Sequence, residues 1–150
     1  MQDIAGCRLV VDDILTQDIV VENLKGLFDK VTVVDRRERP SHGYRAVHVI
    51  VESHGKLIEI QVRTSLQQAW AQLSEKLADE VDSAIKYGGG DEELVSVLAM
   101  MSDASMDVEI AIKTKDINRM TIGLQRCSDL FERLGEIIRR LRGQKDDISN

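Results

Sequence analysis

The chain has 150 residues, of which 43% are hydrophobic and only 3% aromatic, and its formal net charge is −6. Aliphatic side chains are therefore sufficient for the core of one domain, or of one domain with an appendage. No apolar run approaches the roughly 18 residues that a membrane span needs, and we expect no signal peptide, since Gln2 directly follows Met1. The acidic balance argues against a general nucleic-acid or anionic-membrane surface. We expect a cytoplasmic protein with neither as a partner.

The first third of the chain predicts two strands joined by a helix. Residues 4–11 and residues 30–36 are short, valine-rich and apolar, as strands are. Between them, residues 13–28 carry apolar side chains at helical intervals. Either Asp12 or Asp13 can cap this helix.

Residues 44–53 and 57–64 predict a β-hairpin, because both alternate and are rich in valine and isoleucine. His54 and Gly55 lie between them as a two-residue turn. The turn sets a register with one wholly apolar face: Val51 opposite Ile58, Val49 opposite Ile60, and Val47 opposite Val62. A slip of one residue would mix the two faces, so the register is well specified. The resulting order, β-α-β-β-β, predicts an α+β fold with a mixed sheet and helices on one face.

The other face of the hairpin is polar, and ordered polar side chains on a strand need a reason. The same register places Tyr44, Ala46, His48 and Ile50 beside Glu59, Gln61 and Arg63. A carboxylate, an amide, a guanidinium, an imidazole and a phenol on one small patch are typical of a ligand-binding site. The alternative is the solvated outer face of an antiparallel sheet, and the pattern alone leaves both open.

Arginines gather next to this face although the chain is acidic. Arg36, Arg37, Arg39 and Arg45 lie at the entrance to the hairpin, and Arg63 lies near its exit. Guanidinium groups suit forked recognition of phosphate oxygens. The alternative is a solvated loop in which Glu38 is a partner of the arginines.

Residues 65–87 predict an amphipathic helix whose Trp70 is a packing anchor. Its apolar stripe consists of Leu66, Trp70, Leu73, Leu77, Val81 and Ile85. The glycines at positions 88–90 end the helix and form a linker, and Asp91 can cap the next element.

Beyond the linker, two heptad-like stripes predict two long helices with a break at Asn118–Arg119. The stripes are Leu94, Leu98, Met101, Ser105, Val108 and Ile112, and then Met120, Leu124, Cys127, Phe131, Leu134, Ile138 and Leu141. We favour a helical hairpin packed on the sheet, and an oligomer contact is the alternative. The arginines at positions 139, 140 and 142 would offset the helix dipole, and the tail after Gly143 would fray.

The two cysteines, Cys7 and Cys127, lie in separate segments without metal-ligand spacing. We expect both to be buried free thiols in a reducing compartment.

Three blocks of the sequence resemble the synthetases of the RelA/SpoT type, which make the guanosine tetra- and pentaphosphate alarmones, (p)ppGpp. They are Asp3-Ile4-Ala5-Gly6-Cys7-Arg8, Gly43-Tyr44-Arg45-Ala46-Val47-His48, and Glu59-Ile60-Gln61-Val62-Arg63-Thr64. The helix start at residues 66–71 extends the resemblance, which covers about residues 1–80. It implies a nucleotidyltransferase-like mixed sheet and a GTP pyrophosphokinase, which transfers pyrophosphate from ATP to the 3′-hydroxyl of GTP or GDP.

The resemblance also implies roles for single residues. Asp3 and Glu59 would hold Mg²⁺, which prefers carboxylate and phosphate oxygens, and Glu59 would help to deprotonate the attacking hydroxyl. Tyr44 would stack on the guanine base. The remaining substrate-binding candidates are His48, Gln61 and Arg63, which would line the pocket, Arg39, at the place of a basic contact to the acceptor's phosphates, and Arg8 and Arg45.

The sequence departs from the family pattern in three ways. Ala46 replaces a small hydroxyl residue, and the loop before Gly43 is one residue longer than in many relatives. In the family, a helical segment that precedes the Asp strand supplies the arginine and lysine side chains that grip ATP, whereas this chain begins two residues before Asp3. We therefore expect the ATP-binding segment to be lacking and this fragment to be weak or inactive.

We expect a synthetase core at residues 1–87, a glycine linker at 88–90, a helical region at 91–142 for packing or homo-oligomerisation, and a flexible tail at 143–150. Two other functions stay open. One is a non-catalytic guanine-nucleotide-binding or assembly module, and the other is pyrophosphate transfer to another acceptor such as tRNA, which the acidic charge disfavours.

Overall fold

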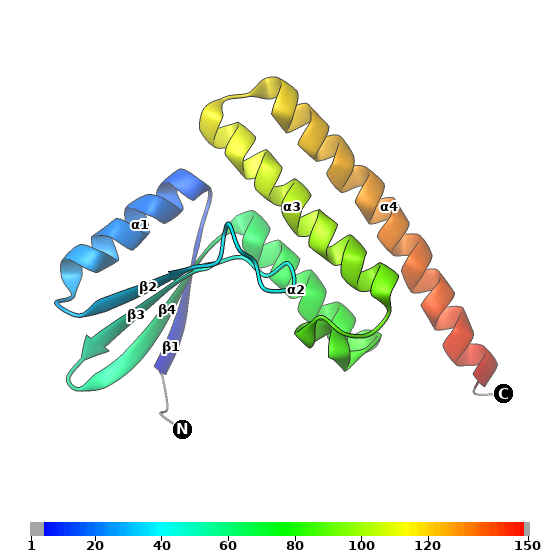
Figure 1. The fold of residues 1–150 in the computed structure, drawn as a ribbon, viewed down its shortest axis with the longest axis horizontal. Coiled ribbons are helices and arrows are strands. Elements are labelled where there is room, and N and C mark those ends of the chain that lie inside the picture. The colour runs from blue at the N-terminus through cyan, green and yellow to red at the C-terminus, as the bar shows by residue number, and fades with distance from the viewer. Residues whose placement is uncertain (1–4, 149–150) are drawn as a thin grey trace. The chain divides into compact units, whose positions relative to one another are not determined.

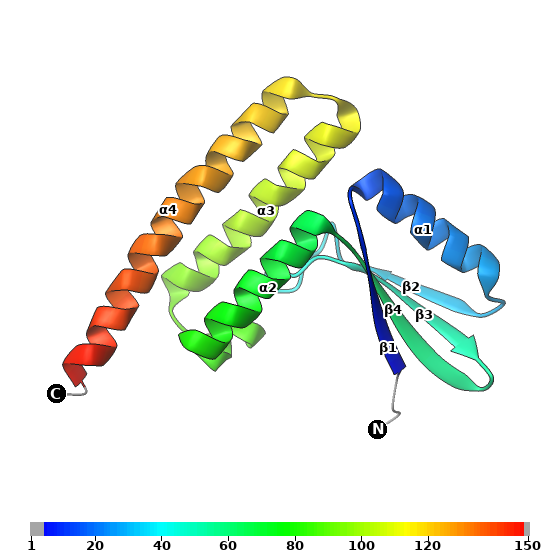
Figure 2. The same cartoon turned by 180° about the vertical axis from the view of Figure 1, so that it is seen from behind.

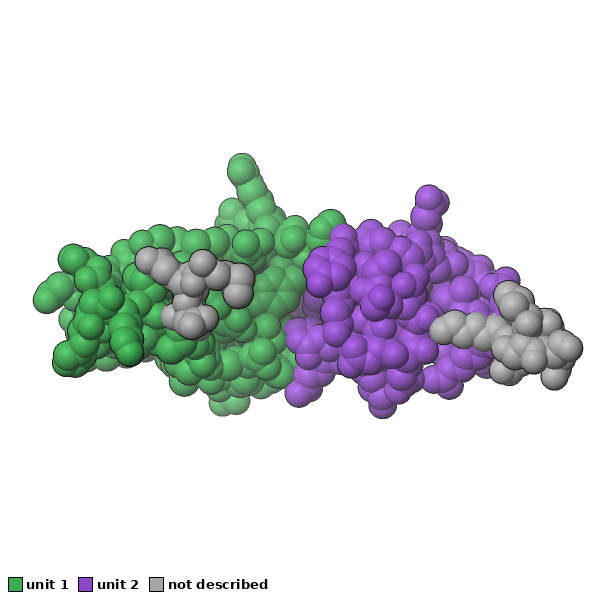
Figure 3. Space-filling view, turned by 90° about the horizontal axis from the view of Figure 1, so that it is seen from below, with its two compact units in different colours: residues 1–68 green, residues 69–150 purple. Residues whose placement is uncertain are grey.

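The structure, a computed structural model, describes the backbone of residues 5–148 and the side chains of residues 5–144. The chain divides into two compact units, Met1–Gln68 and Ala69–Asn150, which Figure 3 colours separately.

The first unit is built on a four-stranded mixed sheet (Figure 1). Its strands lie in the order β1 (Ala5–Val11), β4 (Lys56–Thr64), β3 (Val47–Ser53) and β2 (Val31–Asp35). Strand β1 is parallel to β4, and the other two pairs are antiparallel. The helix α1 (Ile14–Leu27) lies between β1 and β2 in the chain. The predicted order β-α-β-β-β and the mixed sheet are therefore confirmed.

One face of the sheet is covered by α1, which both views of the fold show (Figure 1, Figure 2). Of the two candidate caps, Asp13 is the N-cap, and its Oδ1 accepts from the backbone N–H of Thr16 at 2.7 Å. The core between the helix and the sheet consists of the buried residues Val21, Val47, Val49, Val51, Ile60 and Val62. These include the predicted apolar face of the hairpin, and removing such side chains from water is the main stabilising contribution.

The hairpin register is the predicted one, with Val51 opposite Ile58, Val49 opposite Ile60 and Val47 opposite Val62. His54 and Gly55 have φ angles of 51° and 74°, as the two central residues of a type I′ turn require. Because this turn matches the twist of the strands, it fixes the register that separates the two faces of the sheet.

A second turn of the same kind precedes β3 and corrects the predicted start of that strand. His42 and Gly43 have φ angles of 52° and 87°, and Ser41 and Tyr44 exchange backbone hydrogen bonds across them. Residues 44–46 were predicted as strand, but β3 begins at Val47, because these residues complete the turn instead. Glycine at position 43 provides the left-handed conformation at little cost.

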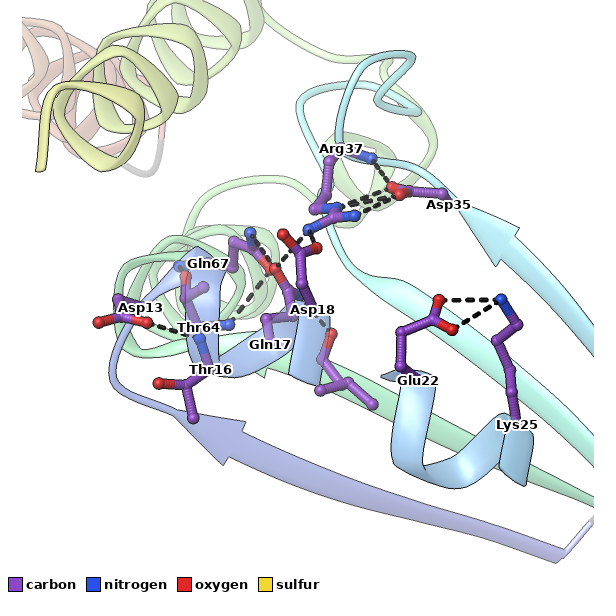
Figure 4. A network of polar contacts seen from close by, with 11 residues as sticks. Asp13, Thr16, Gln17, Asp18, Glu22, Lys25, Asp35, Arg37, Thr64 and Gln67 are labelled. Carbon is purple, nitrogen blue, oxygen red and sulfur yellow. Dashed lines mark hydrogen bonds and ion pairs between the residues drawn. The ribbon is translucent and has the colours of Figure 1, made fainter. Parts of the chain in front are cut away.

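A buried polar contact joins α1 to β4 and α2 (Figure 4). Gln17 is fully buried and its Nε2 donates to the Val62 carbonyl at 2.8 Å and to Gln67 Oε1 at 2.9 Å. Arg37 donates to Asp18 at 2.6 Å and forms a forked pair with Asp35. Arg37 therefore joins the loop between β2 and β3 to α1. We had expected it to lie beside the polar face of the hairpin, together with the other arginines, so this expectation is wrong.

The predicted helix over residues 65–87 is two elements, so that prediction is wrong. Helix α2 spans Ser65–Glu80, and a 3-10 helix, η1, follows at Ser83–Tyr87. The break occurs because the side chain of Asp82 accepts from the backbone N–H of Ala84 at 2.9 Å and starts a new helix. The first four residues of α2 belong to the first unit and the rest to the second.

The second unit ends in two long helices, α3 (Glu92–Thr114) and α4 (Ile117–Ile148). Asp91 caps α3, as predicted. The break lies at Lys115–Asp116 instead of Asn118–Arg119, because the backbone N–H groups of these two residues bond to the last carbonyls of α3. The backbone of α4 stays helical past Gly143, where we had expected a frayed tail; residues 149–150 lie outside the described range.

The heptad stripes are only half buried in this unit. Leu98, Val108 and Leu134 are buried, but Ile112, Leu124 and Phe131 are exposed. Ion pairs fasten α4 to the rest of the unit instead: Arg119 and Arg126 with Asp107, Arg133 with Glu93, Arg140 with Glu93 and Asp91, and Arg142 with Glu80. Arg140 and Arg142 therefore pair with acidic side chains, whereas Arg139 donates to the Gly135 carbonyl of its own helix.

Both cysteines are free, as expected, but they are not buried: Cys7 is exposed on β1 and Cys127 is half-buried on α4. Strand β1 is an edge strand whose side chains lie open, which explains the exposure of Cys7. Within residues 5–148, no helix combines the length and apolar character that crossing a bilayer requires.

Candidate functional site

The face of the sheet opposite α1 carries the predicted polar side chains. In the antiparallel pairing of β3 with β4, His48 lies opposite Gln61 and Ile50 opposite Glu59. The parallel strand β1 adds Arg8 beside Gln61. Because side chains alternate along a strand, these residues share one face and the valine core takes the other.

Five predicted residues from the hairpin and its entrance form one connected set, here called the polar network: Tyr44, His48, Glu59, Gln61 and Arg63. His48 is its centre, with Nδ1 at 2.7 Å from Glu59 Oε1 and Nε2 at 3.1 Å from the Tyr44 hydroxyl. An ionised carboxylate can only accept, so Nδ1 carries the proton. In the neutral imidazole, Nε2 then accepts from the hydroxyl of Tyr44, and Glu59 thereby fixes the histidine tautomer.

Glu59 is the acidic end of the polar network. Its Oε1 bonds to His48, and its Oε2 accepts from Gln61 Nε2 at 3.2 Å. The hydrogen bond from His48 is the largest cause that lowers the pKa of Glu59, with contributions from Gln61 and from the charges of His48 and Arg36, against an opposing effect of burial. The side chain is therefore a carboxylate at neutral pH. Since it is 30% exposed, it remains open to a cation or a ligand.

Arg63 supports the other end of the polar network. It is 4% exposed, and its Nη2 donates to the Tyr44 hydroxyl at 3.0 Å and to Gln61 Oε1 at 3.1 Å. Its Nη1 donates to Gln68 Oε1 at 3.0 Å, and its Cζ lies 4.9 Å from the centre of the Tyr44 ring. His48 meets the same ring edge-on, with the ring centres 5.7 Å apart.

Three predicted substrate-binding arginines lie apart from these contacts. Arg8 and Arg39 are exposed, and neither side chain belongs to the polar network. Arg45, in contrast, is buried. Their roles toward a substrate stay predictions.

Two residues near the polar network were not among the predicted site residues. Arg36 contributes its charge to the lowered pKa of Glu59, and its backbone N–H donates to the Ala46 carbonyl at 3.0 Å. Alternation along the chain could have separated it from Arg37, because neighbours on an extended segment point to opposite faces. Gln68 contacts Arg63 from the first turn of α2, and no sequence signal identified it.

The proposed pairing of Asp3 with Glu59 around a metal stays a prediction, because Asp3 lies outside the described residues. Within residues 5–148, no group of three or more histidine, cysteine, aspartate or glutamate side chains is arranged to hold a metal ion. Glu59 is the carboxylate that the polar network offers.

A family of known proteins matches residues 1–82, and its description is "Region found in RelA / SpoT proteins". An uncharacterized protein of Mycobacterium tuberculosis is 36% identical over 120 residues, which cover 72% of this chain and 44% of that protein. A GTP pyrophosphokinase of Bacillus subtilis is 32% identical over 160 residues, which cover 96% of this chain and 59% of that protein. The chain thus spans about half the length of the curated relatives it matches.

Two solved structures share the fold. The small alarmone synthetase 1 of Bacillus subtilis, bound to its product pppGpp, matches with a TM-score of 0.57 and 27% identity over 76% of this chain and 62% of that one. A GTP pyrophosphokinase family protein of Streptococcus pneumoniae matches with a TM-score of 0.55 over 82% of this chain and 64% of that one. The second match, at 21% identity, bears on the fold alone.

Proposed function

This chain belongs to the family of RelA/SpoT proteins, and on that premise we propose that its protein transfers pyrophosphate from ATP to the 3′-hydroxyl of GTP or GDP. The observation that carries the proposal is the polar network on the face opposite α1. It joins a half-buried aromatic ring, Tyr44, to an ionised carboxylate, Glu59, through one histidine. Transfer between a phosphoryl donor and a purine nucleotide needs both kinds of group. The aromatic ring would hold the purine base, and the carboxylate would act on the charge that develops where the phosphoryl group is transferred.

Within the proposal, Tyr44 stacks on the guanine. His48 keeps the ring of Tyr44 and the carboxylate of Glu59 at a fixed separation, since it bonds to both. Gln61 and Arg63 fix the same two groups from the side. Preorganisation of this kind lowers the barrier by positioning the acceptor before the reaction. The proposed substrates are therefore GTP or GDP as acceptor and ATP as donor, in the cytoplasm.

We propose Mg²⁺ as the cofactor, held by Glu59 together with Asp3. The ionised, partly exposed carboxylate of Glu59 fits a hard cation that prefers oxygen ligands. When bound, the cation would neutralise negative charge on the transferred diphosphate. The lowered pKa makes Glu59 a weak base, so holding charge suits it better than removing the proton of the attacking hydroxyl.

The test is product formation by the natural protein with ATP, Mg²⁺ and either GDP or GTP. We expect AMP to be released together with a guanosine nucleotide carrying a 3′-diphosphate. Glu59→Gln should lower the rate by about 10²-fold or more, as losing a preorganised charge-stabilising group does. Arg133→Lys, which alters an exposed ion pair on α4, is the matched control. If AMP is released with neither GDP nor GTP, or only when tRNA is the acceptor, the proposal is wrong.

A further inference from the structure

We infer that Arg63 is a positioning residue for the acceptor base, which acts through Tyr44 and makes no contact with the nucleotide. The inference rests on the proposed function in so far as Tyr44 is taken to hold guanine. It concerns how that aromatic ring is kept ready for stacking.

The burial of Arg63 is the first reason. A guanidinium that grips phosphates must be open to solvent in the empty site, whereas Arg63 is 4% exposed. Both of its terminal nitrogens already donate to protein oxygens, namely those of Tyr44, Gln61 and Gln68. A phosphate contact would require breaking these hydrogen bonds, and a buried donor left without its acceptor is costly.

The second reason is where the guanidinium lies. Its Cζ is 4.9 Å from the centre of the Tyr44 ring, within the range of a cation–π contact, while Nη2 bonds to the hydroxyl of the same side chain. His48 lies at the ring edge and bonds to the hydroxyl as well. The ring is thus fixed by a cation over one face and by an imidazole at its edge. Only the second face remains for a stacking base.

A third observation concerns the cost of this arrangement. Nε of Arg63 is buried and has no hydrogen-bond partner among the described residues. A buried unsatisfied group in a native protein is destabilising, and such costs gather where function demands them. The position of the guanidinium is therefore set by its contacts with Tyr44 and the two glutamines, although this position leaves Nε without a hydrogen bond.

The chemical consequence separates Arg63 from the exposed arginines. If Arg63 acts through the ring, its contribution to affinity is the same for guanosine, which has no phosphate, and for GDP. If it contacts phosphate directly, its contribution grows with the number of phosphates and falls with salt.

The experiment compares Arg63→Lys with the unchanged chain in NMR titrations with guanosine and with GDP. Lysine keeps the charge but cannot bond to the hydroxyl and both glutamines in a planar fork. We expect affinity to fall roughly tenfold for both ligands, and by the same factor. Tyr44→Phe, which keeps the ring and removes the hydroxyl, should weaken both ligands by a smaller and again equal factor. Arg133→Lys should leave both affinities unchanged.

A second readout needs no nucleotide. The chain has two tyrosines, Tyr44 and Tyr87, so the Tyr44 ring signals are assigned from their loss in Tyr44→Phe. Arg63→Lys should shift these signals and leave those of the exposed Tyr87 in place.

The outcomes separate the inference from the proposed function. A loss confined to GDP, or an affinity unchanged by Arg63→Lys, overturns the positioning role. Unshifted Tyr44 signals in Arg63→Lys overturn it as well. If the unchanged chain binds neither ligand, or Tyr44→Ala binds both normally, the proposed acceptor site is wrong, while the ring signals still report whether Arg63 holds Tyr44.

Discussion

Arg36 and Arg37 are neighbours of the same type with opposite tasks. Arg37 is bonded to Asp18 of α1 and to Asp35, so it serves the α1 side of the sheet. Arg36 instead adds its charge to those that lower the pKa of Glu59. Alternation of side chains along an extended segment is enough to send them to opposite faces.

The first prediction follows from this difference. Arg36→Ala should raise the pKa of Glu59, because a positive charge that favours the carboxylate is removed. The measurement is an NMR titration of the Glu59 side-chain carboxyl carbon. Arg39→Ala, at an exposed position of the same loop, is the control and should leave the pKa where it is. Equal behaviour of the two variants would contradict the assigned role of Arg36.

Single residues also show what the sequence could not reveal. The hairpin pattern found the members of the polar network, because alternation and a two-residue turn determine which side chains share a face. Gln17 was missed, since a glutamine on an apolar helix face gives no sign of a buried partner such as the Val62 carbonyl. The arginines at the entrance to the hairpin were all predicted to lie beside the polar face, because the sequence does not show which of them forms an ion pair with an acidic side chain.

At the scale of elements, the contacts of Arg37 with Asp18 and Asp35 join α1, β2 and the loop that carries Tyr44 (Figure 4). Burial acts to raise the pKa of Asp35, but the hydrogen bonds and the charge of Arg37 outweigh it, and the pKa lies below its ordinary value. The pKa of Arg37 is raised, so this side chain stays charged throughout. The loop is therefore held by an ion pair whose acidic member can be titrated.

The second prediction is a pH dependence of stability. Above the pKa of an unfolded aspartate, about 3.9, the stabilisation from Asp35 is fully present, and it is lost as the pH falls through the lower folded-state pKa. The urea midpoints of the unchanged chain and Asp35→Asn should therefore differ by a constant amount from pH 7 to pH 5 and converge below pH 4. Asp29→Asn, at an exposed position between α1 and β2, should show no such convergence.

The α3–α4 hairpin gives the third prediction, because two glycines of α4 lie in opposite surroundings. A Cβ at Gly123 would lie 2.8 Å from Cγ2 of the buried Val108, whereas a Cβ at Gly135 would meet no atom within 4 Å. We expect Gly123→Ala to cost about 1–2 kcal/mol of unfolding free energy through overpacking against a stiff side chain. Gly135→Ala should add about 0.5–1 kcal/mol, as alanine favours a helix more than glycine does. Denaturant unfolding of both variants decides, and a gain in Gly123→Ala would show that the helices are less closely packed.

The α-helices of the described residues were predictable in number but not in their ends, and the 3-10 helix η1 was not predicted. Periodicity identified α3 and α4 and the cap at Asp91. It did not reveal the stop after Glu80, because Asp82 can occur inside a helix as well as at its N-cap, and the sequence alone does not show which. A heptad pattern also does not show whether another element of the chain packs against each apolar residue. We had therefore expected the whole α4 stripe to be packed, although half of it is exposed.

At the scale of the whole molecule, the exposed half of that stripe bears on assembly. Ile117, Leu124 and Phe131 recur every seven residues along α4 and are 71%, 52% and 57% exposed. A seven-residue repeat is the pattern by which one helix packs along another of the same kind. We therefore propose that α4 meets α4 of a second copy of this chain.

The fourth prediction tests this assembly. A double change of Leu124 and Phe131 to glutamate should lower the molar mass that light scattering reports, because it places charge in the apolar seam. Leu27→Glu, which alters an even more exposed apolar residue of α1, should leave the mass unchanged. A monomeric mass for the unchanged chain would rule out the contact.

The fold and the family could be predicted further than the chemistry of the whole protein. Three short motifs predict the family and the hairpin pattern predicts one register, and the structure has that register. The acceptor side is accordingly where the account can be tested most directly.

The decisive measurement is calorimetry of GDP binding in the presence of Mg²⁺ by residues 1–150 and by Tyr44→Ala. We predict saturable binding with one site for the unchanged chain, and a loss of at least about tenfold in affinity when the ring is removed, since stacking on an aromatic side chain contributes about 1–3 kcal/mol. No binding by the unchanged chain, or equal affinity for both proteins, would contradict the claim that the face opposite α1 holds a guanine nucleotide.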